Sequence, residues 1–208
     1  YGDTIKEHNK PSLPVLHGFL RKWLKDRVNY VHILPFYPYS SDDGFSVIDY
    51  KAVNPELGTW DYVSEIGRNY RLMFDLVVNH ISQQSAWFQN YLTDKAPGKG
   101  FFIEVDPETD LSAVVRPRSL PLLTAFNTVN GKKFVWTTFS ADQIDLNFSN
   151  PQLLAEMLNV YLFYLAKGAR IIRLDAIAFL WKEIGTSCLH LPQTHEVVKL
   201  LRDISEYI

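Results

Sequence analysis

An arginine and an aspartate stand two positions apart near the end of an apolar run. The run reads ARIIRLDA over residues 169–176, and the two residues are Arg173 and Asp175. Side chains two positions apart in a strand point to the same face. A positive charge beside a carboxyl group favours the anion, which can attack an electrophilic carbon. The pair therefore predicts a nucleophile and its partner, and the alternative is a structural ion pair that closes the strand.

Three polar residues interrupt or follow a second apolar run, RLMFDLVVNH over residues 71–80. Asp75 and Asn79 lie four positions apart and are expected to share a strand face, whereas His80 lies where the chain leaves the strand. These side chains suggest hydrogen bonds to a polyhydroxyl ligand, with Asp75 orienting Arg173 from a neighbouring strand. The alternative is that Asn79 and His80 satisfy backbone groups at the start of a loop.

A loop over residues 38–50 combines carboxylates, a glycine and aromatic rings. Aromatic faces pack on the C–H faces of a pyranose, and carboxylates accept hydrogen bonds from neighbouring hydroxyls. Asp42 and Phe45 therefore suggest a clamp for a glucosyl group. The alternative is an ordinary turn with solvated acidic side chains.

Three apolar runs predict the buried parallel strands that would position these residues, over residues 30–36, 71–79 and 169–176. Helical patterns cover residues 13–25, 60–69 and 151–167. The last pattern has Asn150 as a cap, Pro151 at the first helical position and Gly168 at the exit. This alternation predicts an α/β fold, and the pattern alone leaves a barrel and an open sheet as alternatives.

The spacing of the strands predicts an insertion. About 40 positions separate the first two strands and about 90 separate the second from the third, which exceeds an ordinary connection. The excess, residues 81–148, is rich in turn residues and predicts a loop-rich subdomain. Within it, residues 132–138 are expected to form half of a hairpin after Asn130-Gly131.

The composition argues against several classes of partner and location. The 208 residues include 21 Lys and Arg against 23 Asp and Glu, without blocks of one sign, so neither nucleic acid nor an anionic membrane is expected. The single cysteine, Cys188, and the lack of a signal-peptide pattern favour the cytoplasm. The chain starts without methionine and ends within a helical pattern, so we expect a fragment.

Several other residues suggest structural roles. His190 and His195 flank the start of a predicted helix, and no cluster has the spacing of metal ligands, so no metal is expected. Cys188 has no evident base partner and is expected to pack in the core. The tryptophans expected in the core or in helix packing are Trp23, Trp60 and Trp136.

Taken together and in order, four segments resemble the α-amylase family of retaining glycosidases and transglycosidases. They are Asp42-Asp-Gly-Phe45 with Asp49-Tyr50, Asp75-Leu-Val-Val-Asn79-His80, Gln143-Ile-Asp145-Leu-Asn147 and Arg173-Leu-Asp175-Ala. The resemblance implies a (β/α)8 TIM barrel, of which this chain holds about strands 2 to 4, with an inserted subdomain after the third strand. Residues 1–80 would begin the barrel, residues 81–148 would form the insertion and residues 149–208 would continue the barrel, truncated.

The resemblance also implies roles for individual residues. Asp175 would be the nucleophile and Arg173 its partner. The residues implied to bind the glucosyl group or to support that binding are Asp42, Phe45, Asp75, Asn79 and His80. Those implied near the acceptor are Phe139 and Gln143. The general acid and a further stabilising carboxylate would lie past residue 208, so neither Glu183 nor Glu196 is assigned to those roles.

Two further segments resemble the sucrose-phosphorylase subgroup, which includes enzymes that phosphorolyse glucosylglycerate or phosphorylated sucrose. They are Ile33-Leu-Pro-Phe-Tyr-Pro and Lys182-Glu-Ile-Gly-Thr-Ser-Cys188. A third segment, residues 115–118, resembles an active-site loop of that subgroup, but Val115 stands where those enzymes carry an aromatic residue, which argues against sucrose. Arg116 and Arg118 in this loop suit phosphate or an acidic acceptor such as glycerate, and the alternative is a solvated pair.

The implied function is retaining α-glucosyl transfer in the intact parent through a covalent glucosyl group on Asp175. Phosphorolysis of sucrose, sucrose phosphate or glucosylglycerate would give α-glucose 1-phosphate, with inorganic phosphate as co-substrate and no other cofactor. We expect the fragment alone to be inactive. The alternatives are an α-glucoside hydrolase or transglycosidase, and a noncatalytic sugar-binding member of the family.

Overall fold

The computed structural model describes residues 1–207, which form two compact units. The first unit holds residues 1–76 and 159–174, and the second holds residues 77–158 and the residues from 175 onward. None of the helices within residues 1–207 is both long enough and apolar enough to cross a membrane.

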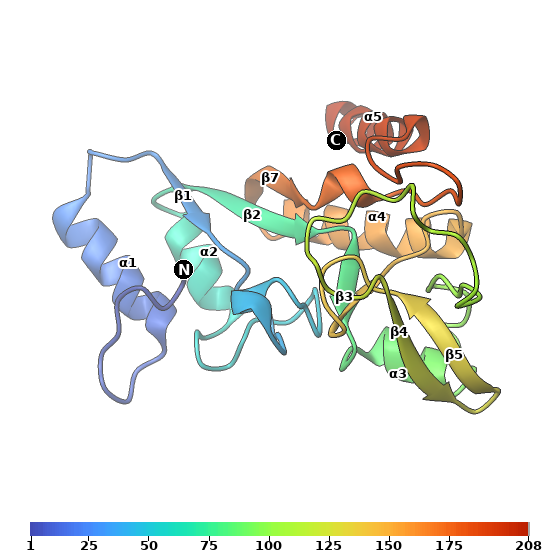
Figure 1. Cartoon of the computed structure of the whole chain (residues 1–208). Helices are drawn as coiled ribbons and strands as arrows, with labels where there is room; N and C mark the ends of the chain where they lie inside the picture. Colours follow the sequence, from blue (N-terminus) through green and yellow to red (C-terminus); the bar gives the residue numbers. More distant parts are fainter. Residues whose placement is uncertain (208) are drawn as a thin grey trace. The chain divides into compact units, whose positions relative to one another are not determined.

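A three-stranded sheet forms the centre of the first unit, in the order β1-β2-β7 (Figure 1). The strands are β1 (Tyr30–Ile33), β2 (Arg71–Val77) and β7 (Ala169–Asp175). β1 and β2 run parallel, with Tyr30 opposite Arg71 and Ile33 opposite Phe74. The three predicted strands are confirmed, but they end earlier than predicted. β1 stops before Pro35, which has no N–H to donate to a neighbouring strand.

Three helices match the helical patterns of the sequence. They are α1 (Ser12–Trp23), α2 (Trp60–Gly67) and α4 (Pro151–Ala166). At the start of α4, the Asn150 side chain accepts a hydrogen bond from the backbone N–H of Gln152 at 2.9 Å, as a capping residue should. The chain leaves this helix through Gly168, whose φ of 95° is left-handed. The predicted cap, start and exit of the helix are confirmed.

Aromatic side chains from the sheet, the helices and the segment after β1 pack together in the first unit. The ring centroid of Phe36 lies 5.0 Å from that of Phe74 in β2 and 5.4 Å from that of Trp60 in α2. Trp60 in turn lies 5.2 Å from Phe163 of α4, edge to face. Each such pair adds about 0.5–1.5 kcal/mol beyond the area it buries. The predicted packing role of Trp60 is confirmed.

The second unit contains two antiparallel strand pairs. β3 (His80–Ser82) pairs with β6 (Gln143–Asp145). β4 (Leu123–Thr128) pairs with β5 (Gly131–Trp136) (Figure 1). The β4-β5 pair turns at Val129-Asn130 and confirms the hairpin predicted near Asn130-Gly131. The helices of this unit, besides the first part of α4, are α3 (Ala86–Leu92) and α5 (Pro192–Tyr207).

Trp136 lies in a buried apolar cluster of the second unit. It is 1% exposed and belongs to a cluster with Val105, Leu122 and Cys188, so the predicted packing roles of Trp136 and Cys188 are confirmed. The same prediction is wrong for Trp23, which is 62% exposed. Trp23 is the last residue of α1 and lies beyond the turns of that helix that are buried.

Candidate active site

Asp75 is fully buried in β2, and both of its carboxylate oxygens accept a hydrogen bond. Oδ1 accepts from Arg173 of β7 at 2.5 Å, and Oδ2 accepts from Nε2 of His32 of β1 at 2.7 Å. The backbone oxygen of Asp75 accepts from the Tyr37 hydroxyl at 3.1 Å. A buried charge without partners is costly. Because β2 lies between β1 and β7, each neighbouring strand supplies a hydrogen-bond donor that offsets the cost of burying the Asp75 carboxylate. The predicted contact between Asp75 and Arg173 is present.

Arg173 also contacts the loop that follows β1. Its side chain is 43% exposed, and its guanidinium carbon lies 5.8 Å from the centre of the Phe45 ring. Gly44 sets the turn before that ring, with a φ of 106°, and a Cβ there would lie 2.7 Å from the backbone oxygen of Pro35. Only glycine fits this turn without strain. The structure thus brings together three predicted residues, Asp75, Arg173 and Phe45.

Asp42 begins η1 (Asp42–Gly44), the short 3-10 turn before Phe45, and is exposed. Its φ of 57° and the φ of 50° at Asp43 are both left-handed, which is uncommon for residues with a side chain. Backbone of this kind persists when the surrounding structure holds it, and it occurs often at ligand sites. The Asp42 carboxylate is therefore carried on a turn of defined shape, close in sequence to Phe45.

In the second unit, the pairing of β3 with β6 brings together residues 63 positions apart. His80 lies opposite Asp145, and Nε2 of Gln143 lies 3.1 Å from Nε2 of His80. The ring centroids of Phe139 and His80 are 5.0 Å apart. The structure therefore gathers three predicted residues, His80, Phe139 and Gln143.

The predicted loop of residues 115–118 contributes one arginine to this group. The guanidinium carbon of Arg118 lies 5.8 Å from the centre of the Phe139 ring. Arg116 instead donates a hydrogen bond to the backbone oxygen of Leu120, within its own loop. Of the two arginines, Arg118 is therefore the one placed beside a predicted site residue.

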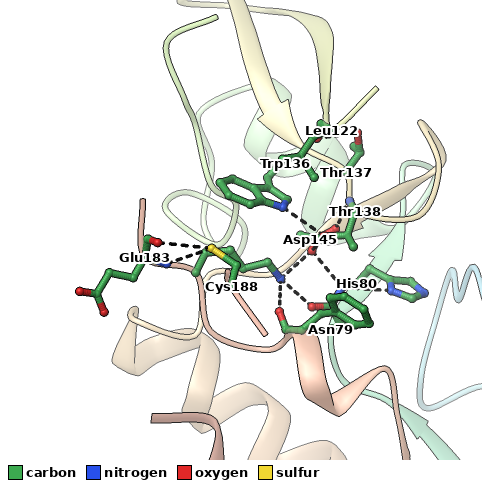
Figure 2. Close-up of polar contacts among 11 residues, drawn as sticks. Asn79, His80, Leu122, Trp136, Thr137, Thr138, Asp145, Glu183 and Cys188 are labelled. Carbon is green, nitrogen blue, oxygen red and sulfur yellow. Dashed lines mark hydrogen bonds and ion pairs between the residues drawn. The ribbon is translucent and has the colours of Figure 1, made fainter. Parts of the chain in front are cut away.

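Asp145, which lies beside His80 (Figure 2), forms a buried ion pair with Lys182. Nζ of Lys182 is 2.6 Å from Oδ2 of Asp145, and their side chains are 4% and 0% exposed. Asp145 also accepts hydrogen bonds from the backbone N–H and the hydroxyl of Thr138, at 2.8 and 2.6 Å, and from the Asn79 amide at 2.9 Å. Burial lowers the pKa of Lys182 from its ordinary value, although the Asp145 charge opposes that shift.

Asn79 does not share a strand face with Asp75, and that prediction is wrong. β2 ends at Val77 and β3 begins at His80, so Asn79 lies in the link between two strands. Its buried amide accepts a hydrogen bond from Lys182 at 2.6 Å and donates one to Asp145. The apolar run hides this break because β3 pairs with a segment that lies far away in the sequence.

Asp175 is the last residue of β7 and is partly buried. The next residue, Ala176, has a left-handed φ of 57°, and η2 (Ile177–Phe179) follows. A residue with a side chain in this conformation costs about 1–3 kcal/mol, which the surrounding structure must offset. The chain turns sharply after Asp175, which therefore stands at the carboxyl end of a strand, where α/β folds bind their ligands.

Three residues of these groups have no role assigned from the sequence: His32, Asp145 and Lys182. Each interrupts an apolar stretch, in YVHILPF, QIDLNF and FLWKEI respectively. A titratable residue in an apolar stretch is expected to need a partner, and this is the signal that points to all three; Asp145 and Lys182 are buried, whereas the His32 side chain is 30% exposed. Within residues 1–207, no three His, Cys, Asp or Glu side chains form a group that could hold a metal ion.

Comparisons with known proteins agree with one another. The family model "Alpha amylase, catalytic domain" matches residues 22–205. The glucosylglycerate phosphorylases of Spirochaeta thermophila and Escherichia coli are 55% and 52% identical to this chain over 100% of its length. The chain spans only 35% and 37% of those two proteins.

One solved structure gives the same match at the level of the fold. The crystal structure of sucrose 6F-phosphate phosphorylase from Thermoanaerobacter thermosaccharolyticum is 31% identical, with a TM-score of 0.86. The match covers 92% of this chain and 42% of that one. The α/β fold of this chain is therefore the fold of the corresponding part of that enzyme.

Proposed function

This chain belongs to the α-amylase family, and from that premise we propose that the full-length protein phosphorolyses glucosylglycerate by retaining glucosyl transfer. The choice of substrate is carried by the difference in identity: 55% and 52% to two glucosylglycerate phosphorylases, against 31% to a sucrose 6F-phosphate phosphorylase. Val115 supports this choice over sucrose, because the resemblance places an aromatic residue at this position in sucrose phosphorylases. The products are α-glucose 1-phosphate and glycerate, and inorganic phosphate is the co-substrate.

In the first step, the Asp175 carboxylate attacks the anomeric carbon of the glucosyl group. A bond forms between a carboxylate oxygen and that carbon, the bond to the glycerate oxygen breaks, and that oxygen takes a proton from a general acid. Retention requires a second carboxyl group about 5–5.5 Å from the nucleophile to serve as this acid. We assign the acid to no residue of this chain; Glu196, for example, forms an exposed ion pair with Lys199.

In the second step, a phosphate oxygen attacks the same carbon from the opposite face to Asp175. Asp175 leaves as a carboxylate, the proton of the phosphate returns to the general acid, and α-glucose 1-phosphate forms. Arg173, two positions earlier on β7, carries a positive charge that favours the anionic form of such a leaving carboxylate. Its bond to the buried Asp75 supports this role, because that bond fixes where the guanidinium lies.

We propose that Asp42, Phe45 and His80 bind the glucosyl group. The Phe45 ring suits the C–H face of a pyranose, and the Asp42 carboxylate suits its hydroxyl groups. Asp75 and Asn79 act one step further away, through their bonds to Arg173 and Lys182.

On the acceptor side, we propose Phe139, Gln143 and Arg118. Glycerate carries a carboxylate, and a guanidinium binds a carboxylate through two parallel hydrogen bonds. The contact between Arg118 and the Phe139 ring supports this assignment.

The proposed architecture follows from the same family. β1, β2 and β7 would be the second to fourth strands of a (β/α)8 barrel, with residues 81–148 inserted between residues 1–80 and 149–208. The order β1-β2-β7, with α2 and α4 between successive strands in the sequence, supports this proposal. The single cysteine supports a cytoplasmic location.

The test uses the full-length protein with glucosylglycerate, sucrose or sucrose phosphate, each with and without inorganic phosphate. We expect glucose 1-phosphate from glucosylglycerate only when phosphate is present. Free glucose at the same rate with and without phosphate would identify a hydrolase instead. Glucose 1-phosphate formed from sucrose or sucrose phosphate but not from glucosylglycerate would contradict the proposed substrate. No product from any of the three glucosides would favour a noncatalytic member of the family.

A further inference from the structure

The Lys182 ammonium of the second unit donates to three oxygen atoms. Nζ lies 2.6 Å from Oδ2 of Asp145, 2.6 Å from Oδ1 of Asn79 and 2.6 Å from the backbone oxygen of Phe179. An ammonium has three N–H groups and no lone pair, so it can only donate. Its partners must therefore each present an acceptor atom to it, which fixes the orientation of the one partner that can turn, the Asn79 amide.

The Asn79 amide is held at both ends. Its Oδ1 faces the Lys182 ammonium, and its Nδ2 lies 2.9 Å from Oδ2 of Asp145 (Figure 2). A half-turn of the amide would set its NH2 group against the ammonium and its oxygen against the carboxylate. Both contacts would then be repulsive inside a buried region, where unmet polar groups are costly. The Asn79 NH2 group is therefore fixed as a donor on the side where His80 lies.

His80 has an amide group next to each of its ring nitrogens. Nδ1 lies 3.4 Å from Nδ2 of Asn79, and Nε2 lies 3.1 Å from Nε2 of Gln143. A neutral imidazole has one donor and one acceptor nitrogen, so the two amides cannot both donate to it. Because Asn79 is fixed as a donor, Nδ1 has to be the acceptor and Nε2 has to carry the proton.

The Gln143 amide can adapt to this arrangement. Ser140 contacts Oε1 of Gln143 through its hydroxyl at 3.0 Å, and a hydroxyl can donate or accept. A half-turn of the Gln143 amide would bring Oε1 to the N–H of His80 and let the NH2 group donate to Ser140. The tautomer that Asn79 requires is therefore compatible with a hydrogen bond between Nε2 of His80 and the Gln143 amide.

We propose that Lys182 is a positioning residue that acts through Asn79 to hold His80 as the neutral tautomer protonated at Nε2. This inference rests on the proposed function, in which His80 contacts the glucosyl group. It deepens that function, since any oxygen that meets Nε2 of His80 has to accept a hydrogen bond. A purely structural Lys182 would neutralise Asp145 without affecting the ring of His80.

The direct test measures the tautomer in the full-length protein, with 15N-labelled histidine and two-bond 1H–15N correlation spectra. A His80→Gln variant identifies the His80 signals. We expect the spectrum to show Nε2 protonated and Nδ1 unprotonated. A proton on Nδ1, alone or together with one on Nε2, would overturn the proposal. Because this measurement requires no turnover, its result stands even if glucosylglycerate proves not to be the substrate.

A pair of variants tests the part played by Lys182. In Lys182→Met the Asn79 amide keeps only its contact with Asp145, so we expect the other tautomer of His80 to become detectable. We also expect kcat/KM for glucosylglycerate to fall by about 10- to 100-fold, as when a functional histidine loses its orienting partner. The control is Lys133→Met, which removes a half-exposed lysine paired with Glu104 and should change neither readout.

Each outcome of this comparison decides the question. A folded Lys182→Met protein with the wild-type tautomer and wild-type kcat/KM would overturn the proposal. If Lys182→Met does not fold, a proton on Nδ1 of His80 in the wild-type protein still overturns the proposal. A wild-type protein that is inactive on every glucoside but has the expected tautomer would contradict the proposed function and leave the orienting role of Lys182 intact.

Discussion

Two fully buried carboxylates, Asp75 in the first unit and Asp145 in the second, differ in the cation that each one binds. Asp75 pairs with Arg173, whose side chain is 43% exposed, whereas Asp145 pairs with Lys182, whose side chain is 4% exposed. Arg173 is bonded to the Asp75 carboxylate and is also accessible to solvent, whereas the Lys182 ammonium donates to three oxygen atoms inside its unit. The exposure of the cation thus distinguishes the two pairs. The Asp75–Arg173 pair can contact a substrate directly, whereas the Asp145–Lys182 pair can act only through its neighbours.

The largest effect on activity is expected at Asp175 of β7, the strand that also carries Arg173. Asp175→Asn in the full-length protein removes the anion that we propose attacks the glucosyl carbon, so kcat/KM for glucosylglycerate should fall about 10⁴-fold or more. The measurement is the rate of glucose 1-phosphate release, with circular dichroism to check that the variant is folded. Activity close to that of the wild type would remove Asp175 from the role of nucleophile.

The largest effect on stability is expected at the buried ion pair of Asp145 and Lys182. Asp145→Asn leaves the Lys182 charge buried without a counter-charge, which should lower the free energy of unfolding by about 3–5 kcal/mol. Asp75→Asn leaves Arg173 with access to water, so its loss should be closer to that of a charged hydrogen bond, about 1.5–3 kcal/mol. Urea unfolding of both variants tests this order, and an equal or larger loss for Asp75→Asn would break the comparison.

A smaller effect is expected at the turn that carries Phe45. Gly44→Ala places a Cβ 2.7 Å from a backbone oxygen, whereas Gly131→Ala meets nothing within 4 Å, and both positions have a left-handed φ. Gly44→Ala should therefore be the less stable variant by about 1–3 kcal/mol, the usual cost of overpacking. It should also raise KM for glucosylglycerate, which Gly131→Ala should not do. Equal stability and equal KM for the two variants would show that the shape of this turn is unimportant.

The smallest effect concerns how the contribution of the Asp145–Lys182 ion pair to stability depends on pH. Burial lowers the pKa of Lys182 in the folded protein below its ordinary value of 10.5, so between the two values the unfolded chain binds more protons. The free energy of unfolding of the wild type, relative to that of Lys182→Met, should therefore rise with pH up to about that ordinary value. A relative stability that falls with pH would mean that the attraction to Asp145 outweighs burial and raises the pKa.

The sequence predicts the parts of the fold that local patterns determine. The helix at residues 151–166 is marked by Asn150 and Gly168, and the hairpin is marked by Asn130-Gly131; both are present. Apolar runs likewise locate the three strands of the first unit. These features depend on residues that are near one another in the chain, so one sequence is enough to predict them.

The candidate site depends on pairings between segments that are far apart in the sequence, and local patterns do not predict such pairings. Nothing local shows that β3 pairs with β6, yet this ladder sets His80 opposite Asp145 and removes Asn79 from the strand of Asp75. The segment of Lys182 resembles that of a subgroup of the family, but nothing in its sequence indicates that the Lys182 ammonium reaches Asn79. The residue types of the site are thus readable from the sequence, while the partners that orient them emerge only in three dimensions.

In the proposed mechanism, the glucosyl group is bound covalently to Asp175 between two separate displacements. The measurement that tests it most directly is isotope exchange: the full-length protein is incubated with glucose 1-phosphate and labelled inorganic phosphate, with no glycerate present. A covalent glucosyl group on Asp175 predicts that label enters glucose 1-phosphate without the acceptor, and that Asp175→Asn abolishes the exchange. Exchange that occurs only when glycerate is added would contradict the covalent intermediate.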